Sequence, residues 1–149
     1  MKIRFIYQSD DYDLSREIII SKLCEAVSCV LELPTEIEVK FAYLGESVYG
    51  NTALGHRFKN RININSNLTI KEIPDILVHE LIHLNQVLTG ILRVTNSHYY
   101  WRGRAYKIDN PDELDYNAYK ELPWEADVAN KQHFVMRQAL LHALKRVDN

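Results

Sequence analysis

The sequence predicts an α+β fold, with one domain over residues 1–149 in which helices back a small mixed β-sheet. Short stretches alternate between apolar and polar residues, as half-buried strands do: residues 2–7, 37–43 and 61–65. Longer stretches carry apolar residues at helical spacing: residues 14–31, the segment ending near 89, and 123–146. The length suffices for one sizeable core.

Composition and charge limit the kinds of partner. Apolar content of 46% and charged content of 26% are ordinary for a soluble globular protein. A net charge of −2 gives no broad basic surface, so neither a nucleic acid nor an acidic membrane is expected as a partner. The first residues lack the apolar core of a signal peptide, and no stretch approaches the roughly 20 apolar residues of a membrane-spanning helix. We therefore expect a cytoplasmic protein.

The first half reads as strand, helix and strand. Residues 2–7 form the first predicted strand, and the helix over 14–31 stops before Pro34. Cys24 and Cys29 point about 140° apart on that helix, so we expect two buried, reduced thiols rather than a disulfide or a metal site. Residues 44–60 hold three of the five glycines and predict a turn-rich connection or a loose hairpin.

The next helix carries the central motif. Thr69 and Glu72 have capping-box spacing, whereas Pro74 favours a later start, and Gly90 marks the end after Thr89. Within it lies His79-Glu80-Leu81-Ile82-His83. A spacing of four residues stacks the two histidines on one face, where two imidazoles can bind one Zn²⁺. Glu80 is one step round the helix, within reach of a water on that metal.

The surroundings of the motif favour a metal over a chance pattern or a surface histidine pair. The helix is apolar almost all round, which predicts burial: Ile76, Leu77, Val78, Leu81, Ile82, Leu84, Val87 and Leu88. Burying His79, Glu80 and His83 without partners would be costly, and a metal removes that cost.

The second half supplies candidates for a third ligand. Residues 91–108 predict strands or a hairpin, 109–112 a turn, and 123–146 the last helix. Gln86 and Thr89 exclude an HExxHxxGxxH arrangement. The remaining candidates are His98, Glu113, Glu121, Glu125, Asp127 and His133.

Glu125 is the best candidate on position, with His98 next. Glu125 lies at the start of the last helix, which would be a rigid platform facing the motif helix. Asp127 is about 200° away round that helix, so only one of the two can face the metal. The alternative is that Glu125 simply favours the positive end of the helix dipole.

Three motifs in order resemble a family of small phage- and prophage-encoded zincin-like metallopeptidases. They are His79-Glu80-Leu81-Ile82-His83 with Gln86, then Trp101-Arg102-Gly103-Arg104 with Tyr106, then Pro123-Trp124-Glu125. The resemblance covers about residues 77–129. It implies a gluzincin in which His79, His83 and Glu125 bind Zn²⁺. A metal-activated water would hydrolyse a peptide bond of a protein or peptide substrate, with Glu80 as general base.

The resemblance leaves several parts of the site open. In the larger gluzincins an acid four residues after the ligand Glu orients a histidine, but that position is Ala129, leaving Asp127 and Asn130 as candidates for this role. The group that stabilises the oxyanion is open among five side chains: Tyr100, Tyr116, Tyr119, His98 and Arg102.

Two further expectations depend on the resemblance. In a zincin, residues 61–65 would suit an edge strand that pairs with an extended peptide; the alternative is an ordinary strand with Asn63 and Asn65 facing water. A phage-encoded protein would be found in the host cytoplasm or the virion.

Two other functions compete with a general peptidase. One is a zinc-stabilised binding or assembly protein without turnover, for which a fourth protein ligand such as His98 would close the site. The other is a regulatory protease that cleaves a single cytoplasmic protein.

Overall fold

A computed structural model describes the chain except for residues 10–11, 46–49, 54–59, 96, 109–113 and 148–149. The helices and strands, in order, are β1 Lys2–Tyr7, α1 Leu14–Ser28, β2 Glu36–Ala42, β3 Gly50–Ala53, β4 Arg61–Asn65, α2 Ile73–Leu88, β5 Leu92–Val94, β6 Tyr99–Trp101, β7 Arg104–Tyr106, α3 Tyr116–Glu121 and α4 Pro123–Val147. The α+β prediction, with a small mixed sheet, is confirmed. None of the described helices is both long and apolar enough to cross a membrane.

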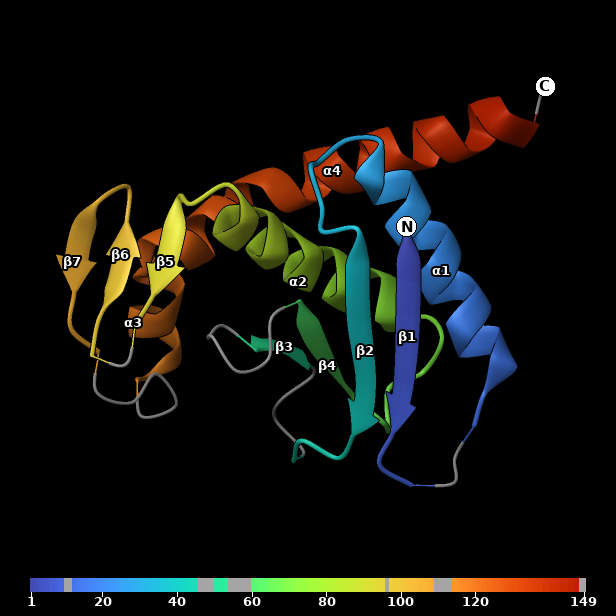
Figure 1. Ribbon diagram of the computed structural model, residues 1–149, viewed down its shortest axis with the longest axis horizontal. Coiled ribbons are helices and arrows are strands. Elements are labelled where there is room, and N and C mark those ends of the chain that lie inside the picture. The colour runs from blue at the N-terminus through green and yellow to red at the C-terminus, as the bar shows by residue number, and fades with distance from the viewer. Residues whose placement is uncertain (10–11, 46–49, 54–59, 96, 109–113, 148–149) are drawn as a thin grey trace.

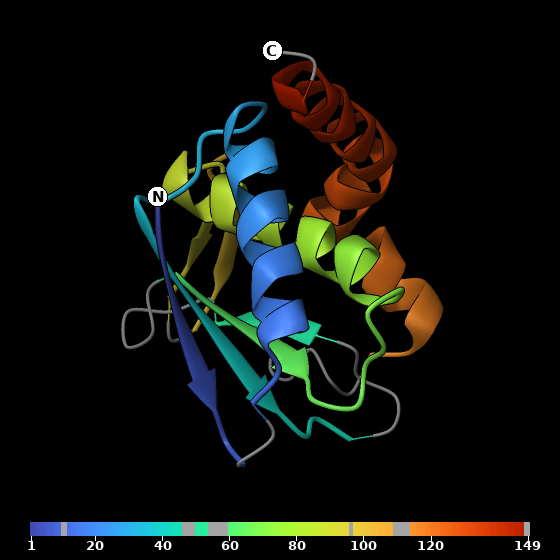
Figure 2. The ribbon, with the colours of Figure 1, turned by 90° about the vertical axis from the view of Figure 1, so that its right-hand side faces the viewer.

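The main sheet has the order β1-β2-β4-β3, with β3 antiparallel to three parallel strands. Helices α1 and α2 cover one face of it, as Figures 1 and 2 show. The alternation of apolar residues in β2 sends Ile37, Val39 and Phe41 into the core beneath these helices. The sheet therefore supplies a firm base for α2, which carries the motif.

The edge of this sheet is not formed by residues 61–65, as the resemblance to zincins led us to expect. Strand β4 lies between β2 and β3, so residues 61–65 are an internal strand and that expectation is wrong. The edge strands of the described sheet are β1 and β3. β3 lies within residues 44–60 and pairs antiparallel with β4, so this segment supplies one strand of a hairpin. Its four residues, Gly-Asn-Thr-Ala, have no apolar alternation that would have predicted a strand.

Gly50 allows β3 to run close against α2. A Cβ at this position would lie 2.8 Å from Ile76 Cγ2, 3.2 Å from the Asn63 carbonyl oxygen and 3.8 Å from Glu80 Cγ. We expect Gly50→Ala to lower the free energy of unfolding by about 1–3 kcal/mol, because the strand or Ile76 must shift. Chemical denaturation would measure this, with exposed Gly90→Asn as a control. An unchanged midpoint for Gly50→Ala would contradict the close approach.

The structure shows where α1 ends and where α2 begins. α1 ends at Ser28 rather than 31, which leaves Cys29 exposed as the cap residue and Cys24 buried; the expectation that both thiols are buried is wrong for Cys29. α2 begins at Ile73 with Pro74 in its first turn. Thr69 donates its N–H and its hydroxyl hydrogen to Glu72 in a turn that precedes the helix.

The burial of α2 is less complete than its composition predicted. Its middle is buried, but Val87 and Leu88 in the last turn are 40% and 44% exposed. The helix ends there, with Gly90 at φ +80° just beyond it. The predicted turn at residues 109–112 lies outside the described residues.

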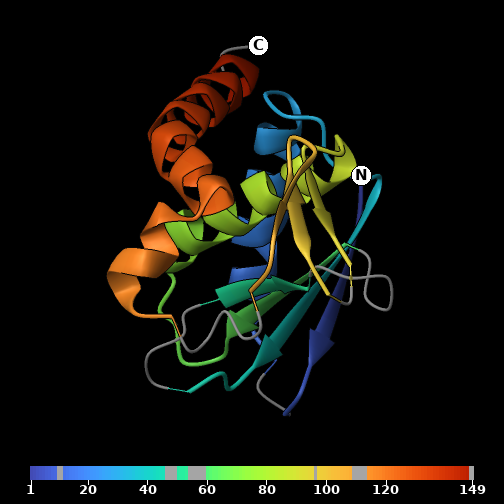
Figure 3. The ribbon, with the colours of Figure 1, turned by 90° about the vertical axis from the view of Figure 1, so that its left-hand side faces the viewer.

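Strands β5, β6 and β7 form a second, antiparallel sheet and confirm the strands expected over residues 91–108. Arg102 and Gly103 join β6 to β7 with φ values of +50° and +84°, as a two-residue type I′ hairpin turn requires. Tyr99 stacks on Trp124, with ring centroids 5.0 Å apart, and Tyr106 meets the same ring edge-on at 5.7 Å. This sheet is therefore packed on the start of α4, beside α2 (Figure 3).

Candidate metal centre

The motif histidines and Glu125 meet where α2 packs against the start of α4. His83 Nε2 lies 2.9 Å from Glu125 Oε1 and 3.2 Å from Oε2, and His79 Nε2 lies 3.4 Å from Oε2. One ligand atom from each of the three residues lies within 4.8 Å of the other two. The structure therefore brings together His79, His83 and Glu125 as a group that could hold a metal ion.

The residues of the group differ in how far they are exposed to solvent. Glu80, His83 and Glu125 are 5%, 4% and 6% exposed, whereas the side chain of His79 keeps 31% of its exposure. A buried carboxylate between two imidazoles is costly unless a cation compensates it. His79 is therefore the member of the metal group that is most exposed to solvent.

Gln86 holds the buried histidine in one orientation. Its side-chain nitrogen donates to the Trp124 carbonyl oxygen at 3.0 Å and to Asp127 Oδ2 at 2.9 Å, and both are acceptors. The amide oxygen must then face His83 Nδ1, at 2.8 Å. Nδ1 therefore carries a proton that it donates to Gln86, which directs Nε2 at Glu125.

The two charged partners shift each other's ionisation. Burial would raise the pKa of Glu125, but hydrogen bonds from His79 and His83, the charge of His83 and the Tyr119 hydroxyl together hold that pKa well below its usual range. Burial would lower the pKa of His83, but Glu125, Glu80 and Gln86 outweigh burial and raise it. Without a metal, a proton sits between Nε2 and the carboxylate.

This arrangement fits a metal ion chemically. With Nδ1 committed to Gln86, a neutral His83 presents a lone pair to Glu125, and two acceptors at 2.9 Å need a cation between them. A proton or a metal ion can supply it. Two imidazole nitrogens and a carboxylate are the donor set of the His₂Glu zinc sites.

If the group holds a metal ion, we expect Gln86→Met to weaken its affinity for added Zn²⁺ about 10- to 100-fold, because the change removes the acceptor that orients His83 while keeping the side-chain length. Titration against a chromogenic zinc chelator would measure the affinity. Gln138→Met, on α4, controls for the same exchange at a partly exposed site. Equal affinity in a folded Gln86→Met protein would mean that the hydrogen bond does not position the ligand.

Tyr119 adds a hydroxyl at the same point. It lies on α3, and its hydroxyl donates to Glu125 Oε1 at 2.6 Å. Of the five side chains considered for the oxyanion, it is the one with a described hydrogen bond to the metal group. The sequence pattern did not predict α3, although Asp115, whose side chain accepts from the Ala118 N–H, is a recognisable N-cap.

The other candidates lie elsewhere. Asp127 faces Gln86 and forms an ion pair with Lys131 at 3.0 Å, so it supports the site indirectly, while Asn130 is exposed. His98 contacts Ser97 and the ring of Tyr100. Glu121 and His133 are exposed and outside the group found among the described residues, and Glu113 lies outside that part of the chain.

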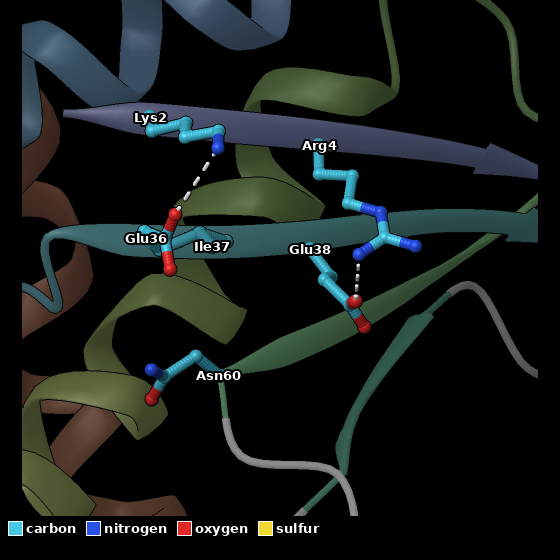
Figure 4. Close-up of a pocket in the computed structure, with 6 residues that line it drawn as sticks. All are labelled: Lys2, Arg4, Glu36, Ile37, Glu38 and Asn60. Carbon is cyan, nitrogen blue, oxygen red and sulfur yellow. Dashed lines mark ion pairs between the residues drawn. The ribbon is translucent and has the colours of Figure 1, made fainter.

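A separate pocket lies on strands β1 and β2, lined by Lys2, Arg4, Glu36, Ile37, Glu38 and Asn60 (Figure 4). Cross-strand ion pairs run across it, Lys2 with Glu36 at 3.4 Å and Arg4 with Glu38 at 3.7 Å. Its charges are paired on an exposed sheet face, and it shares no residue with the metal group. We assign it no function.

The fold and the site define an α+β protein with a His-His-Glu group suited to a metal ion. Comparison with protein-family models, with curated proteins and with solved structures gave no match.

Proposed function

We propose that the protein is a zinc-dependent metallopeptidase of the zincin-like kind. His79, His83 and Glu125 would hold Zn²⁺, and Glu80 would be the general base. The observation that carries the proposal is that His79 and His83 on α2 meet Glu125 on α4, although His83 and Glu125 are 42 residues apart in the sequence.

The donor set favours zinc, and the number of donors favours catalysis. Imidazole nitrogens with one carboxylate suit zinc better than magnesium or calcium, which prefer oxygen ligands. Three protein ligands leave a fourth position open, as catalytic zinc sites do. When bound, the metal would supply Lewis-acid polarisation of a substrate carbonyl.

Glu80 is the candidate for proton transfer. It neighbours His79 on α2 and is buried, and Gly50 of the edge strand passes close to it. In the proposed reaction Glu80 takes a proton from the attacking water and gives it to the nitrogen of the leaving amine. The C–N bond breaks, and the water oxygen remains on the new carboxylate. The Tyr119 hydroxyl would leave Glu125 Oε1, to which it donates in the structure, and donate to the oxyanion.

The edge strand offers a place for the substrate chain. β3 pairs with β4 on one side, and no described strand pairs with its other side, which is where we propose that an extended peptide binds. This moves the peptide-binding edge from residues 61–65 to 50–53, directly beside Glu80.

The test is cleavage of an unstructured protein. Zinc-loaded protein incubated with reduced, alkylated casein should produce new N-termini detectable by mass spectrometry. A chelator should stop cleavage and added zinc should restore it. One zinc per chain with no cleavage of casein or of random peptide libraries would favour the zinc-stabilised binding protein. Against that alternative, His98 is not part of the described metal group.

A further inference from the structure

The second sheet carries a concentration of positive charge that the proposed chemistry does not use. Residues 89–108 contain Arg93, Arg102, Arg104 and Lys107 and no acidic residue. The rest of the chain holds 14 basic and 20 acidic residues, a net charge of −6. A local charge of +4 therefore stands out against an acidic protein.

These four cations are exposed. None of them forms an ion pair with another described residue. Three guanidinium groups instead lie over aromatic rings: Arg93 over Tyr100 at 4.6 Å, Arg102 near Trp101 at 5.8 Å and Arg104 near Tyr106 at 5.4 Å. Such contacts hold the side chains in place and leave N–H donors for an anionic partner.

The backbone conformation of Arg102, in the turn between β6 and β7, also supports a role in binding. Arg102 has a left-handed backbone in a position where asparagine or glycine is usual. An arginine is tolerated there at a cost in stability. A role in binding gives a reason for an arginine at this position.

The basic sheet is attached directly to the candidate metal centre. Its Tyr99 stacks on Trp124, the residue before Glu125, and the Trp124 carbonyl accepts from Gln86, which holds His83. The sheet is therefore in contact with the element that carries Glu125. In Figure 1 the three strands stand at the end of the molecule where α4 begins.

We propose that the face of this basic sheet that carries Arg93, with Arg102 at the turn beside it and Lys107 just after β7, binds an acidic segment of the polypeptide substrate; Arg104 is on the opposite face of the sheet. The inference rests on the proposed peptidase function and names its substrate class. Carboxylates of Asp and Glu match guanidinium groups in charge and geometry. A long nucleic acid carries one negative charge per about 1.7 Å and would meet the acidic remainder of the surface, so a short acidic peptide segment is favoured.

The test is fluorescence anisotropy with the full-length protein and three labelled probes. These are a 12-residue Asp/Glu-rich peptide, its Asn/Gln counterpart, and a 12-nucleotide oligo-dT. Binding needs no turnover, so it is independent of the casein assay. We expect the acidic peptide to bind at least tenfold more tightly than the neutral one and to weaken steeply with added salt.

A charge-reversed variant locates the binding. Arg93→Glu with Arg102→Glu should weaken acidic-peptide binding at least tenfold. Lys22→Glu with Lys71→Glu, which changes the net charge equally at exposed sites elsewhere, should change it less than threefold. Equal loss in both variants, or equal binding of the acidic and neutral peptides, would overturn the proposal. Tight oligo-dT binding that only the first variant loses, without acidic-peptide binding, would assign the surface to nucleic acid instead.

If the double variant fails to fold, the salt dependence of the wild-type protein decides. Acidic-peptide affinity that does not fall between low and high salt would rule out an electrostatic docking surface. Binding that succeeds while casein remains intact would keep the surface and reject the peptidase; cleavage without peptide preference would do the reverse.

Discussion

Replacing Glu80 with glutamine is expected to lower the rate of peptide hydrolysis about 10²- to 10⁴-fold while zinc stays bound. Glutamine keeps the shape of the side chain but cannot accept the proton from water. None of the proposed ligands changes, so zinc per chain should remain equal to that of the wild type. The measurement is the initial rate of casein cleavage beside zinc content by atomic absorption.

Glu32→Gln, which changes an exposed acid in the connection between α1 and β2, is the matched control and should retain the full rate. Cleavage by the Glu80→Gln protein at the wild-type rate would remove the general-base role. It would also point to a contaminating protease if the chelator left that activity intact.

Replacing Glu125 with alanine is expected to weaken zinc binding by roughly 100-fold or more, because it removes one of three ligands, a larger loss than that of a supporting residue. The reason is geometric: both histidines are on α2, and Glu125 is the proposed ligand that α4 contributes. Zinc per chain after equilibration with a weak chelator would show the loss.

Glu121→Ala controls for removing an acid from the same region, since Glu121 is exposed and outside the described group. Zinc content unchanged by Glu125→Ala would contradict the three-ligand site. Loss in both variants would mean that the general acidity near α4, rather than the Glu125 carboxylate, attracts the metal.

Local spacing accounts for the part of the site that the sequence predicted. His79 and His83 share a helix face by periodicity alone, and burial of Glu80 follows from its apolar neighbours. The sequence could name Glu125 as a candidate only among several, because its approach to α2 depends on how α4 packs. The role of Gln86 was missed for the same reason: its partners are the Trp124 carbonyl and Asp127, about 40 residues away.

The errors also have local causes. β3 is four residues long and paired only on one side, so no pattern distinguishes it from a loop. Cys29 looked buried because the helix was extended past Ser28, where Val30 and Leu31 continue the apolar spacing. Val87 and Leu88 looked buried because composition does not reveal where the partner surface ends.

The meeting of α2 and α4 at Glu125 has a consequence for stability. A metal held by His83 and Glu125 would close a loop of 42 residues that contains the second sheet and α3. A permanent cross-link of that length reduces the entropy of the unfolded chain by an amount worth on the order of 4 kcal/mol. The metal would thus act as a reversible cross-link that stabilises the C-terminal half. The closed loop does not include β1, β2, β4 and α1, so their unfolded segments gain no such constraint.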